Sequence, residues 1–337
     1  MSKLTIRDIA RMAGVSTTAV SFVLNNRSGV SETTRKKVQE IIERTGFTPN
    51  VHTRRLILGK SLTVHVVLQQ HNYDLANQFA LDTLSGIFKA SNRLGYSIIF
   101  TFAEEPVDPN QVIESVRNKD CDGIILYQIN DASLISLLQK EQIPFVCVDA
   151  HIVKDGSLPM VEVDYFDAAY QATMYLHRCG HTDIGFVGPT TPAEYYVSTF
   201  GGYSAALKDA NLVCNPAWLT EISFAEDSAA NCVNQLLSVP QLPTALLCAG
   251  DAYAVDFIRC LKAKGIRIPE DISIMSMDDL MISRHLDPPL STMSFPKEQL
   301  GEQAMQLLYQ IMSQEEYRTV NLIKTTPIER STVSNYK

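Results

Sequence analysis

The chain has 337 residues, of which 45% are hydrophobic and 20% charged, and this composition excludes the disordered and fibrous classes of protein. No apolar stretch is long enough to cross a membrane, and the first residues are charged and amphipathic rather than a signal peptide, so we expect a cytoplasmic protein. The formal net charge of -8 is uneven, because residues 1–60 hold 11 Lys and Arg against 4 Asp and Glu. A basic head on an acidic body indicates that only the head meets polyanions.

Three short helices are predicted in the basic head. Thr5 with Asp8 resembles a capping box that starts the first helix, and Gly14 then turns the chain. Ser16 and Ser31 are good N-caps for the second and third helices. One side of each helix is apolar, through Ile6, Ile9, Ala10, Ala13, Ala19, Val20, Val23, Leu24, Val38, Ile41 and Ile42. Two short helices joined by a glycine turn, with a third in support, are typical of a helix-turn-helix DNA reader.

The second helix has an outward face that includes an aromatic residue. Helix-turn-helix motifs place the N-terminal end of this helix in the major groove, where hydroxyls bind base edges. Phe22 can contact a thymine methyl or fold back into the core, and the pattern favours neither reading. Arg27, Arg35 and Lys36 contact phosphate or form a solvated face. The candidate DNA-binding residues of the head are Thr5, Ser16, Thr17, Thr18, Ser21, Phe22, Asn25 and Arg27.

A basic segment with the sequence NVHTRRLILGKS follows the head. It is too short to form a stable helix in isolation, but it can become helical when two copies meet over a minor groove. Its candidate DNA-binding residues are Arg54 and Leu56, and Leu56 would be a wedge between base steps. The alternative is a plain linker.

From residue 62 onward, β-rich runs alternate with helical patterns. The runs are LTVHVVL, YSIIFTF, DGIILY, PFVCVD, DIGFVG, LTEISF, TALLCAG and DISIMSM. This alternation predicts parallel sheets whose faces are covered by helices. It occurs twice, with a joint near residues 151–162, so we infer two similar α/β lobes with a ligand cleft between them at the C-terminal ends of the strands.

Residues that closely follow the predicted strands are the candidates for this cleft. They are Asn77, Phe79, Tyr127, Asp149, Tyr195, Thr199, Phe224, Gly250, Asp251 and Asp278. Phe79 and Phe224 are alternatively core aromatics. Asp278 is the strongest single candidate.

Other classes of function have less support. Seven scattered cysteines without a C-x-x-C pair indicate reduced, mostly buried thiols. The stretch HRCGHTD brings His177, Cys179 and His181 together, but their spacing favours a polar helix end over zinc, so no metal is expected. No G-x-S-x-G elbow, P-loop or H-E-x-x-H motif is present, so we predict no catalytic residue and no cofactor. A solute-binding protein for transport would account for the body but not for the basic head.

Several long stretches resemble one known family. TIRDIARMAGVSTTAVSFVLN, VSETTRKKVQEIIERTGFTPN and RRLILGK closely resemble the DNA-binding head and hinge of the LacI/GalR family of bacterial transcription regulators. DGIIL, GHTDIGFVG, GGYSAAL, DISIMSMDD, PPLSTMSFPKEQLGEQA and PIERSTV follow in family order. The resemblance implies a two-lobed, periplasmic-binding-protein-like body. The expected domains are a helix-turn-helix domain at 1–48, a hinge at 49–61 and a body at 62–337, with an N-lobe at about 62–161 and 291–320 and a C-lobe at about 162–290 and 321–337.

The resemblance also implies a repressor that binds a pseudo-palindromic, double-stranded operator as a homodimer. A small molecule, commonly a saccharide, would control its affinity for the operator. In the family, the positions of Thr17, Thr18 and Phe22 read bases, and that of Leu56 is the minor-groove wedge. Carboxylates at the positions of Asp149 and Asp278 bind effector hydroxyls or support the pocket. The absence of leucine heptads after RSTVSNYK predicts a dimer rather than a tetramer.

Three positions depart from the family pattern. Phe22 stands where an arginine usually forms two hydrogen bonds with guanine, which predicts a different half-site. Thr199 and Gly250 replace an arginine and an asparagine, so the cleft loses side-chain donors. This argues against an effector carboxylate or phosphate. A neutral saccharide and a less polar effector both stay open, as do inducer and co-repressor roles.

Overall fold

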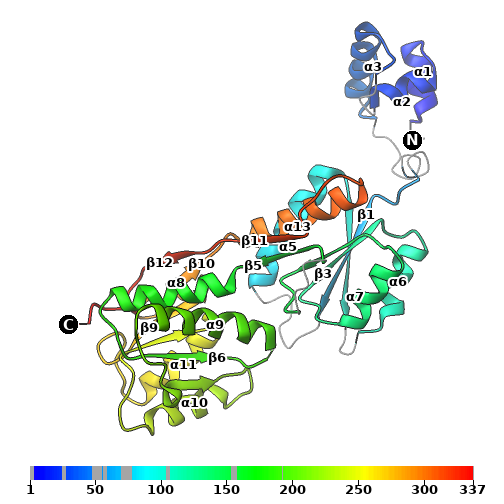
Figure 1. Ribbon diagram of the computed structural model, residues 1–337. Coiled ribbons are helices and arrows are strands. Elements are labelled where there is room, and N and C mark those ends of the chain that lie inside the picture. The colour runs from blue at the N-terminus through cyan, green and yellow to red at the C-terminus, as the bar shows by residue number, and fades with distance from the viewer. Residues whose placement is uncertain are drawn as a thin grey trace. The chain divides into compact units, whose positions relative to one another are not determined.

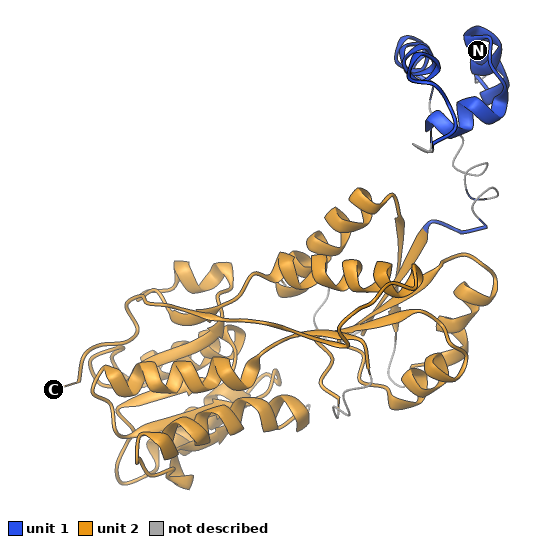
Figure 2. Ribbon diagram, turned by 45° about the horizontal axis from the view of Figure 1, so that its top comes forward, with its two compact units in different colours: residues 1–62 blue, residues 63–337 orange. Residues whose placement is uncertain are grey.

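The computed structural model describes residues 4–24, 28–47, 55, 59–69, 78–103, 107–152, 158–191 and 193–336. The chain divides into two compact units, Met1–Leu62 and Thr63–Lys337, which are blue and orange in Figure 2. No described helix is both long and apolar enough to cross a lipid bilayer.

The described residues 4–24 and 28–47 of unit 1 form three short helices around one small core. They are α1 (Ile6–Ala13), α2 (Thr17–Leu24) and α3 (Glu32–Thr45) (Figure 1). Gly14 and Gly46 end α1 and α3 in the left-handed conformation that glycine adopts without strain. The predicted apolar sides of the three helices meet in this core, except that Ala19 lies outside it. The helix-turn-helix prediction is therefore confirmed.

Unit 2 consists of two α/β lobes, each built on a six-stranded sheet. The sheet of lobe 1 has the order β11-β5-β4-β3-β1-β2, and each described ladder in it is parallel. Its strands are β1 (Thr63–Gln69), β2 (Ser97–Ala103), β3 (Gly123–Tyr127), β4 (Phe145–Val148), β5 (Met160–Val163) and β11 (Val320–Ile323). Its helices are α5 (Gln78–Leu94), α6 (Pro109–Arg117), α7 (Ala132–Lys140) and α13 (Lys297–Met312).

The sheet of lobe 2 has the order β12-β10-β9-β8-β6-β7 and is parallel except for the β10–β12 pair. Its strands are β6 (Ile184–Gly188), β7 (Leu219–Glu221), β8 (Ala245–Cys248), β9 (Ser273–Asp278), β10 (Ser291–Ser294) and β12 (Thr326–Ile328). Its helices are α8 (Tyr165–Arg178), α9 (Ala193–Asp209), η1 (Pro216–Trp218), α10 (Ser228–Leu237), α11 (Asp251–Ala263) and α12 (Met281–His285). Each of the eight β-rich runs of the sequence forms a strand, so the predicted parallel α/β architecture is confirmed.

The chain passes between the lobes three times within the described residues. It leaves lobe 1 after β5, returns before α13, and leaves again after β11 (Figure 1). Two crossings differ from the expected boundaries. Residues 291–294 lie in lobe 2 rather than in the N-lobe, because β10 pairs with β9. Lobe 1 extends to Ile323, because β11 pairs with β5.

Two glycines bring α5 and α13 of lobe 1 into direct backbone contact. A Cβ atom on Gly86 would lie 1.9 Å from the carbonyl oxygen of Glu298, and one on Gly301 would lie 1.9 Å from that of Thr83. Neither position has room for a side chain. The returning segment is thus fixed against the first helix of the lobe.

Candidate functional site

The start of α2 is capped and its first residues face solvent. The Ser16 Oγ atom accepts the backbone N–H of Ala19 at 3.1 Å, so Ser16 is the predicted cap. Thr17 and Thr18 are exposed and Ser21 is half-buried. The helix therefore presents two hydroxyl side chains at the end that a helix-turn-helix motif directs toward DNA.

Thr5 is exposed at the start of α1, but its hydroxyl is already used within the head. It donates to the Asp8 carboxylate at 2.7 Å, and the same carboxylate accepts the Thr5 backbone N–H at 3.0 Å. These bonds lower the pKa of Asp8. The Thr5 hydroxyl is therefore engaged by Asp8 within the head, and its contact with DNA stays a prediction.

Phe22 is half-buried and does not belong to the core of the head. Its ring covers the backbone of Gly29, since a Cβ atom on that glycine would lie 2.8 Å from the Phe22 Cε2 atom. Phe22 thus folds back on the loop after α2 but stays outside the core cluster of the described head. Its contact with a base stays a prediction.

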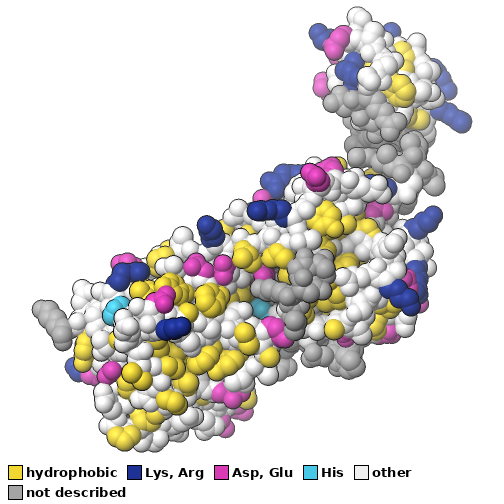
Figure 3. All heavy atoms as spheres, viewed as in Figure 1, with side chains coloured by type: hydrophobic (Ala, Val, Ile, Leu, Met, Phe, Trp, Pro, Cys, Tyr) yellow, Lys and Arg dark blue, Asp and Glu magenta, His cyan; other side chains and the backbone are white. Residues whose placement is uncertain are grey.

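Basic side chains are exposed on the helices of the head. Arg7, Arg11, Lys36 and Lys37 all face solvent, and Figure 3 shows Lys and Arg side chains projecting from unit 1. This arrangement suits attraction to phosphates. The other predicted DNA-binding residues, Asn25, Arg27, Arg54 and Leu56, lie outside the described part of the chain, as does Asn77 of the predicted cleft.

Between the two lobes, five polar residues form what we call the interlobe cluster: Tyr127, Asp149, Tyr165, Tyr195 and Asp278. Asp149 is buried and accepts the Gln128 amide at 2.8 Å and the Tyr165 hydroxyl at 2.9 Å. The rings of Tyr165 and Tyr195 meet edge to face with centroids 4.8 Å apart. The Asp149 and Asp278 charges both raise the pKa values of Tyr127, Tyr165 and Tyr195, after burial, which is the largest cause.

Asp278 and Asp251 lie next to each other but have different surroundings. Asp251 is fully buried and accepts hydrogen bonds from the Leu280 N–H at 2.8 Å, the Thr292 hydroxyl at 2.7 Å and the Ser283 hydroxyl. Asp278 is half-buried, so part of its side chain stays exposed. Its pKa is raised well above the usual range by desolvation and by the Asp251 charge, although the Lys297 ammonium opposes this shift. Asp251 therefore holds the loop after β9. Asp278 also receives a hydrogen bond from the Asp251 backbone, but it keeps an exposed fraction that a ligand can reach.

The remaining predicted cleft residues are placed as follows. Phe79 is buried against Phe295, with ring centroids 5.4 Å apart, which fits its alternative reading as a core aromatic. Phe224 is 47% exposed and stacks on Tyr253 at 4.2 Å. Thr199 is fully buried and donates to the Tyr195 carbonyl oxygen at 2.9 Å. A Cβ atom on Gly250 would lie 3.5 Å from an Asp278 carboxylate oxygen, so Gly250 leaves that oxygen uncovered.

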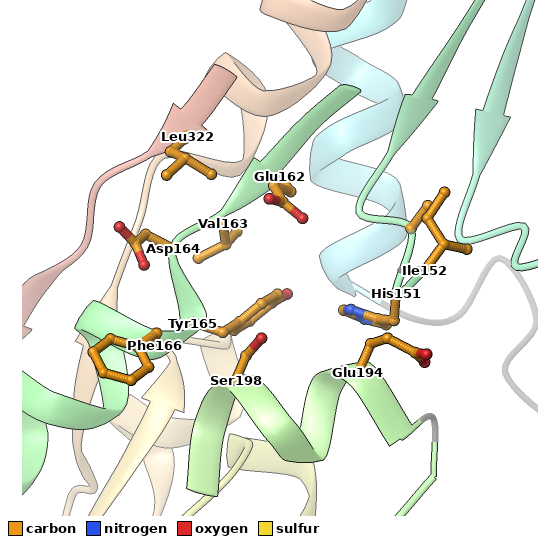
Figure 4. Close-up of a pocket in the computed structure, with 11 residues that line it drawn as sticks. His151, Ile152, Glu162, Val163, Asp164, Tyr165, Phe166, Glu194, Ser198 and Leu322 are labelled. Carbon is orange, nitrogen blue, oxygen red and sulfur yellow. The ribbon is translucent and has the colours of Figure 1, made fainter. Parts of the chain in front are cut away.

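A small pocket of about 60 Å³ adjoins the cluster at the crossing between the lobes. Figure 4 shows His151 and Tyr165 pointing toward each other across it, and their ring centroids are 5.6 Å apart. Glu162, Asp164 and Glu194 also line it. Sequence reasoning missed His151, Tyr165 and Gln128. Gln128 directly follows the predicted Tyr127, and His151 lies two residues after the predicted Asp149, so their positions could have indicated them. No comparable signal marks Tyr165.

The polar side chain of His181, in the HRCGHTD stretch, is held by hydrogen-bond partners within lobe 2. His181 is buried, and its ring nitrogens lie 3.0 Å from the Thr244 hydroxyl and 3.1 Å from the Ser334 carbonyl oxygen. The described residues contain no group of three or more His, Cys, Asp or Glu arranged to hold a metal ion. All seven cysteines are free thiols.

Known proteins match this chain along its whole length. Residues 5–50 match the family described as bacterial regulatory proteins, lacI family, and residues 173–333 match the periplasmic binding protein-like domain. The HTH-type transcriptional repressor PurR of Haemophilus influenzae (strain PittEE) is 32% identical over 309 residues, which cover 90% of each chain. The ribose operon repressor of Haemophilus influenzae (strain ATCC 51907 / DSM 11121 / KW20 / Rd) is 30% identical over 98% of this chain and 99% of its own.

Solved structures show the same fold. The lac repressor dimer bound to operator and the anti-inducer ONPF has a TM-score of 0.77 at 23% identity, covering 99% of this chain and 100% of that one. The complex of the transcriptional regulator CelR with cellobiose has a TM-score of 0.74 at 24% identity, with 98% and 99% covered.

Proposed function

Since the chain belongs to the lacI family of bacterial regulatory proteins, we propose that it represses transcription by binding a pseudo-palindromic operator as a homodimer. It is a DNA-binding regulator and not an enzyme, like the repressors to which it is similar. A small molecule bound between the lobes controls its affinity for the operator. It acts in the cytoplasm, where a bacterial repressor meets chromosomal DNA.

The observation that carries this proposal is the exposed face of α2. Thr17 and Thr18 face solvent at its capped start, and Phe22 follows one turn later outside the core. Hydroxyls can bond base edges in the major groove, and an aromatic ring can contact a thymine methyl. Exposed basic side chains on the same small unit supply attraction to the phosphates.

An apolar face of lobe 1 supports the homodimer. The side chains of Leu81 and Phe88 on α5 and of Ile99, Phe100 and Phe102 on β2 are each more than 40% exposed. β2 is an edge strand of its sheet. An exposed apolar edge strand invites pairing or aggregation, so a stable protein has to cover it. A second copy of this chain would bury it.

The effector acts by changing the contacts that hold lobe 1 against lobe 2. Gln78 at the start of α5 accepts the Met281 backbone N–H at 2.6 Å, so a direct hydrogen bond joins lobe 1 to lobe 2 beside the interlobe cluster. A ligand in the cluster would bias this contact and the separation of the two hinges in the dimer. Such coupling is reciprocal, so the operator should change effector affinity by the same factor as the effector changes operator affinity.

The test is selection and sequencing of genomic fragments of the source organism on the purified full-length protein at moderate salt. Enrichment of one pseudo-palindrome supports the proposal, and the neighbouring genes would indicate effector classes. An absence of enrichment, both alone and with extracts of small metabolites that could hold a co-repressor, would contradict it. A plain solute-binding protein would give this negative result.

A further inference from the structure

One hydroxyl in the interlobe cluster is buried without a hydrogen bond. Tyr127, at the end of β3, is 3% exposed, and its OH makes no hydrogen bond of good geometry among the described residues, although the Thr83 hydroxyl lies close enough to lower its pKa. The neighbouring Thr83 hydroxyl donates instead to the Phe79 carbonyl oxygen at 3.0 Å. The Asp149 and Asp278 charges raise the pKa of Tyr127, so its hydroxyl lies within reach of their field. A buried, unsatisfied hydroxyl at this place indicates a missing ligand atom.

The same region has more carboxylates than cations. Asp149, Asp251 and Asp278 all contribute negative charge to it, since each raises the pKa of Tyr195. The donors to Asp149 and Asp251 described above are neutral, so they satisfy oxygens without cancelling charge.

The cations closest to Asp278 are already engaged. The Lys297 ammonium donates to the Asp278 backbone carbonyl oxygen and lies 4.6 Å from the centre of the Phe295 ring. Arg284 and Arg330 both donate to the carboxylate of the next residue, Asp279. The Lys297 ammonium lowers the pKa of Asp278. Burial and the Asp251 charge raise the pKa of Asp278 in spite of Lys297. A cationic ligand would favour the ionised form of Asp278, whereas a neutral ligand would leave its pKa raised.

Aromatic rings complete a site suited to a cation. Asp278 raises the pKa values of Tyr195 and Tyr253, so both rings lie near it, and Phe224 stacks on Tyr253. Electron-rich ring faces attract ammonium groups, and a carboxylate adds a charge-assisted hydrogen bond. Thr199 and Gly250 add no positive charge that would repel such a group.

We propose that the effector of this protein is a small organic cation, a protonated amine on a hydroxylated skeleton such as an amino sugar or amino polyol. Asp278 pairs with its ammonium group and Tyr127 hydrogen-bonds one of its polar atoms. This inference rests on the proposed function, because it names the chemical class of the ligand held between the lobes. It excludes anionic effectors and ranks neutral saccharides below their amino counterparts.

The experiment is calorimetric titration of the full-length protein with matched pairs that differ by one amine in place of a hydroxyl. The probes are glucosamine and glucose, galactosamine and galactose, and glucamine and sorbitol. The amine of at least one pair should bind about tenfold more tightly than its hydroxyl counterpart. N-acetylation, which removes the charge, should abolish the advantage.

Two variants assign the effect to the site. Asp278→Asn keeps the shape of the side chain and should remove the amine preference. Asp256→Asn is the matched control, since Asp256 is exposed on α11 and pairs with Arg259 at 3.4 Å, and it should retain the preference. Melting curves verify that both variants are folded.

Three results would overturn the inference. They are tighter binding of the hydroxyl member of the pairs, an amine preference that survives Asp278→Asn, and no binding of any amine at about 10 mM, where an uncompensated acidic site should retain weak affinity. The proposed function is judged separately by operator selection. Enrichment of an operator together with any of these results rejects the cationic effector alone.

Discussion

Phe22 is the residue of the head whose replacement should change which bases the protein prefers. Replacing it with arginine should give each half-site a preference for guanine at one position, because arginine can donate two hydrogen bonds to guanine and phenylalanine cannot. Thr33→Arg is the control, since Thr33 is exposed on α3 and this variant adds the same charge elsewhere in the head. Selection of random duplexes would reveal the change. If Phe22→Arg and the unaltered protein select the same sequences, Phe22 does not face the bases.

Tyr127 and Tyr203 offer a matched pair for testing an unsatisfied hydroxyl. Tyr127→Phe should leave the stability of the ligand-free protein unchanged or higher, because it removes a buried group without a partner. Tyr203→Phe should cost about 1 kcal/mol, since that hydroxyl donates to the Ile184 carbonyl oxygen at 2.7 Å. Urea unfolding monitored by circular dichroism measures both. Equal losses would mean that the Tyr127 hydroxyl does have a partner.

At the residue level, the sequence indicated which side chains lie at the ends of strands. Tyr127 and Asp278 end β3 and β9, Asp149 directly follows β4, and parallel strands bring these ends together. Their role in binding an effector stays a prediction. The sequence-based prediction ranked Asp278 first, but it could not show that Asp251 is already bonded, because its three donors come from residues 280, 283 and 292. It also could not show that the Phe22 ring rests on Gly29, which is a loop contact.

The α5–α13 contact is the element most sensitive to a single added methyl group. Gly301→Ala should destabilise the protein by about 1–3 kcal/mol, because its Cβ would meet the Thr83 carbonyl oxygen and force the two helices apart. Gly201→Ala on α9 is the control, since its Cβ would lie 3.4 Å from the Phe166 ring, and alanine also favours a helix. Thermal unfolding of both variants compares them. A neutral Gly301→Ala would contradict the close contact.

Among the elements, the strands with apolar runs were predictable, whereas four strands without such runs were not. The eight predicted strands are rich in branched and aromatic residues. By contrast β5, β10, β11 and β12 each carry polar residues, such as the buried Glu162 of β5, so they do not stand out as apolar runs in the sequence. Their pairing depends on where the chain crosses between the lobes. The crossings near 290 and 320 were therefore expected only from the family resemblance.

At the scale of the whole molecule, the dimer should depend on the apolar face of lobe 1. Phe100→Asp places a charge on edge strand β2 and should convert the dimer to a monomer, with a large loss of operator affinity because two heads no longer bind together. Val213→Asp is the control, since Val213 is 78% exposed in lobe 2 and should leave the dimer intact. Sedimentation velocity distinguishes the two states. A dimer that survives Phe100→Asp would require another interface.

The three passages of the chain between the lobes also constrain how the protein is made. Lobe 1 lacks α13 and β11 until residue 323 has been synthesised, and lobe 2 lacks β12 until residue 328. Both lobes are therefore completed almost together, at the end of translation, although their first strands emerge far apart in time. The head, whose core is local in sequence, can fold much earlier. A nascent chain would consequently display a folded DNA reader before it has any means of sensing an effector.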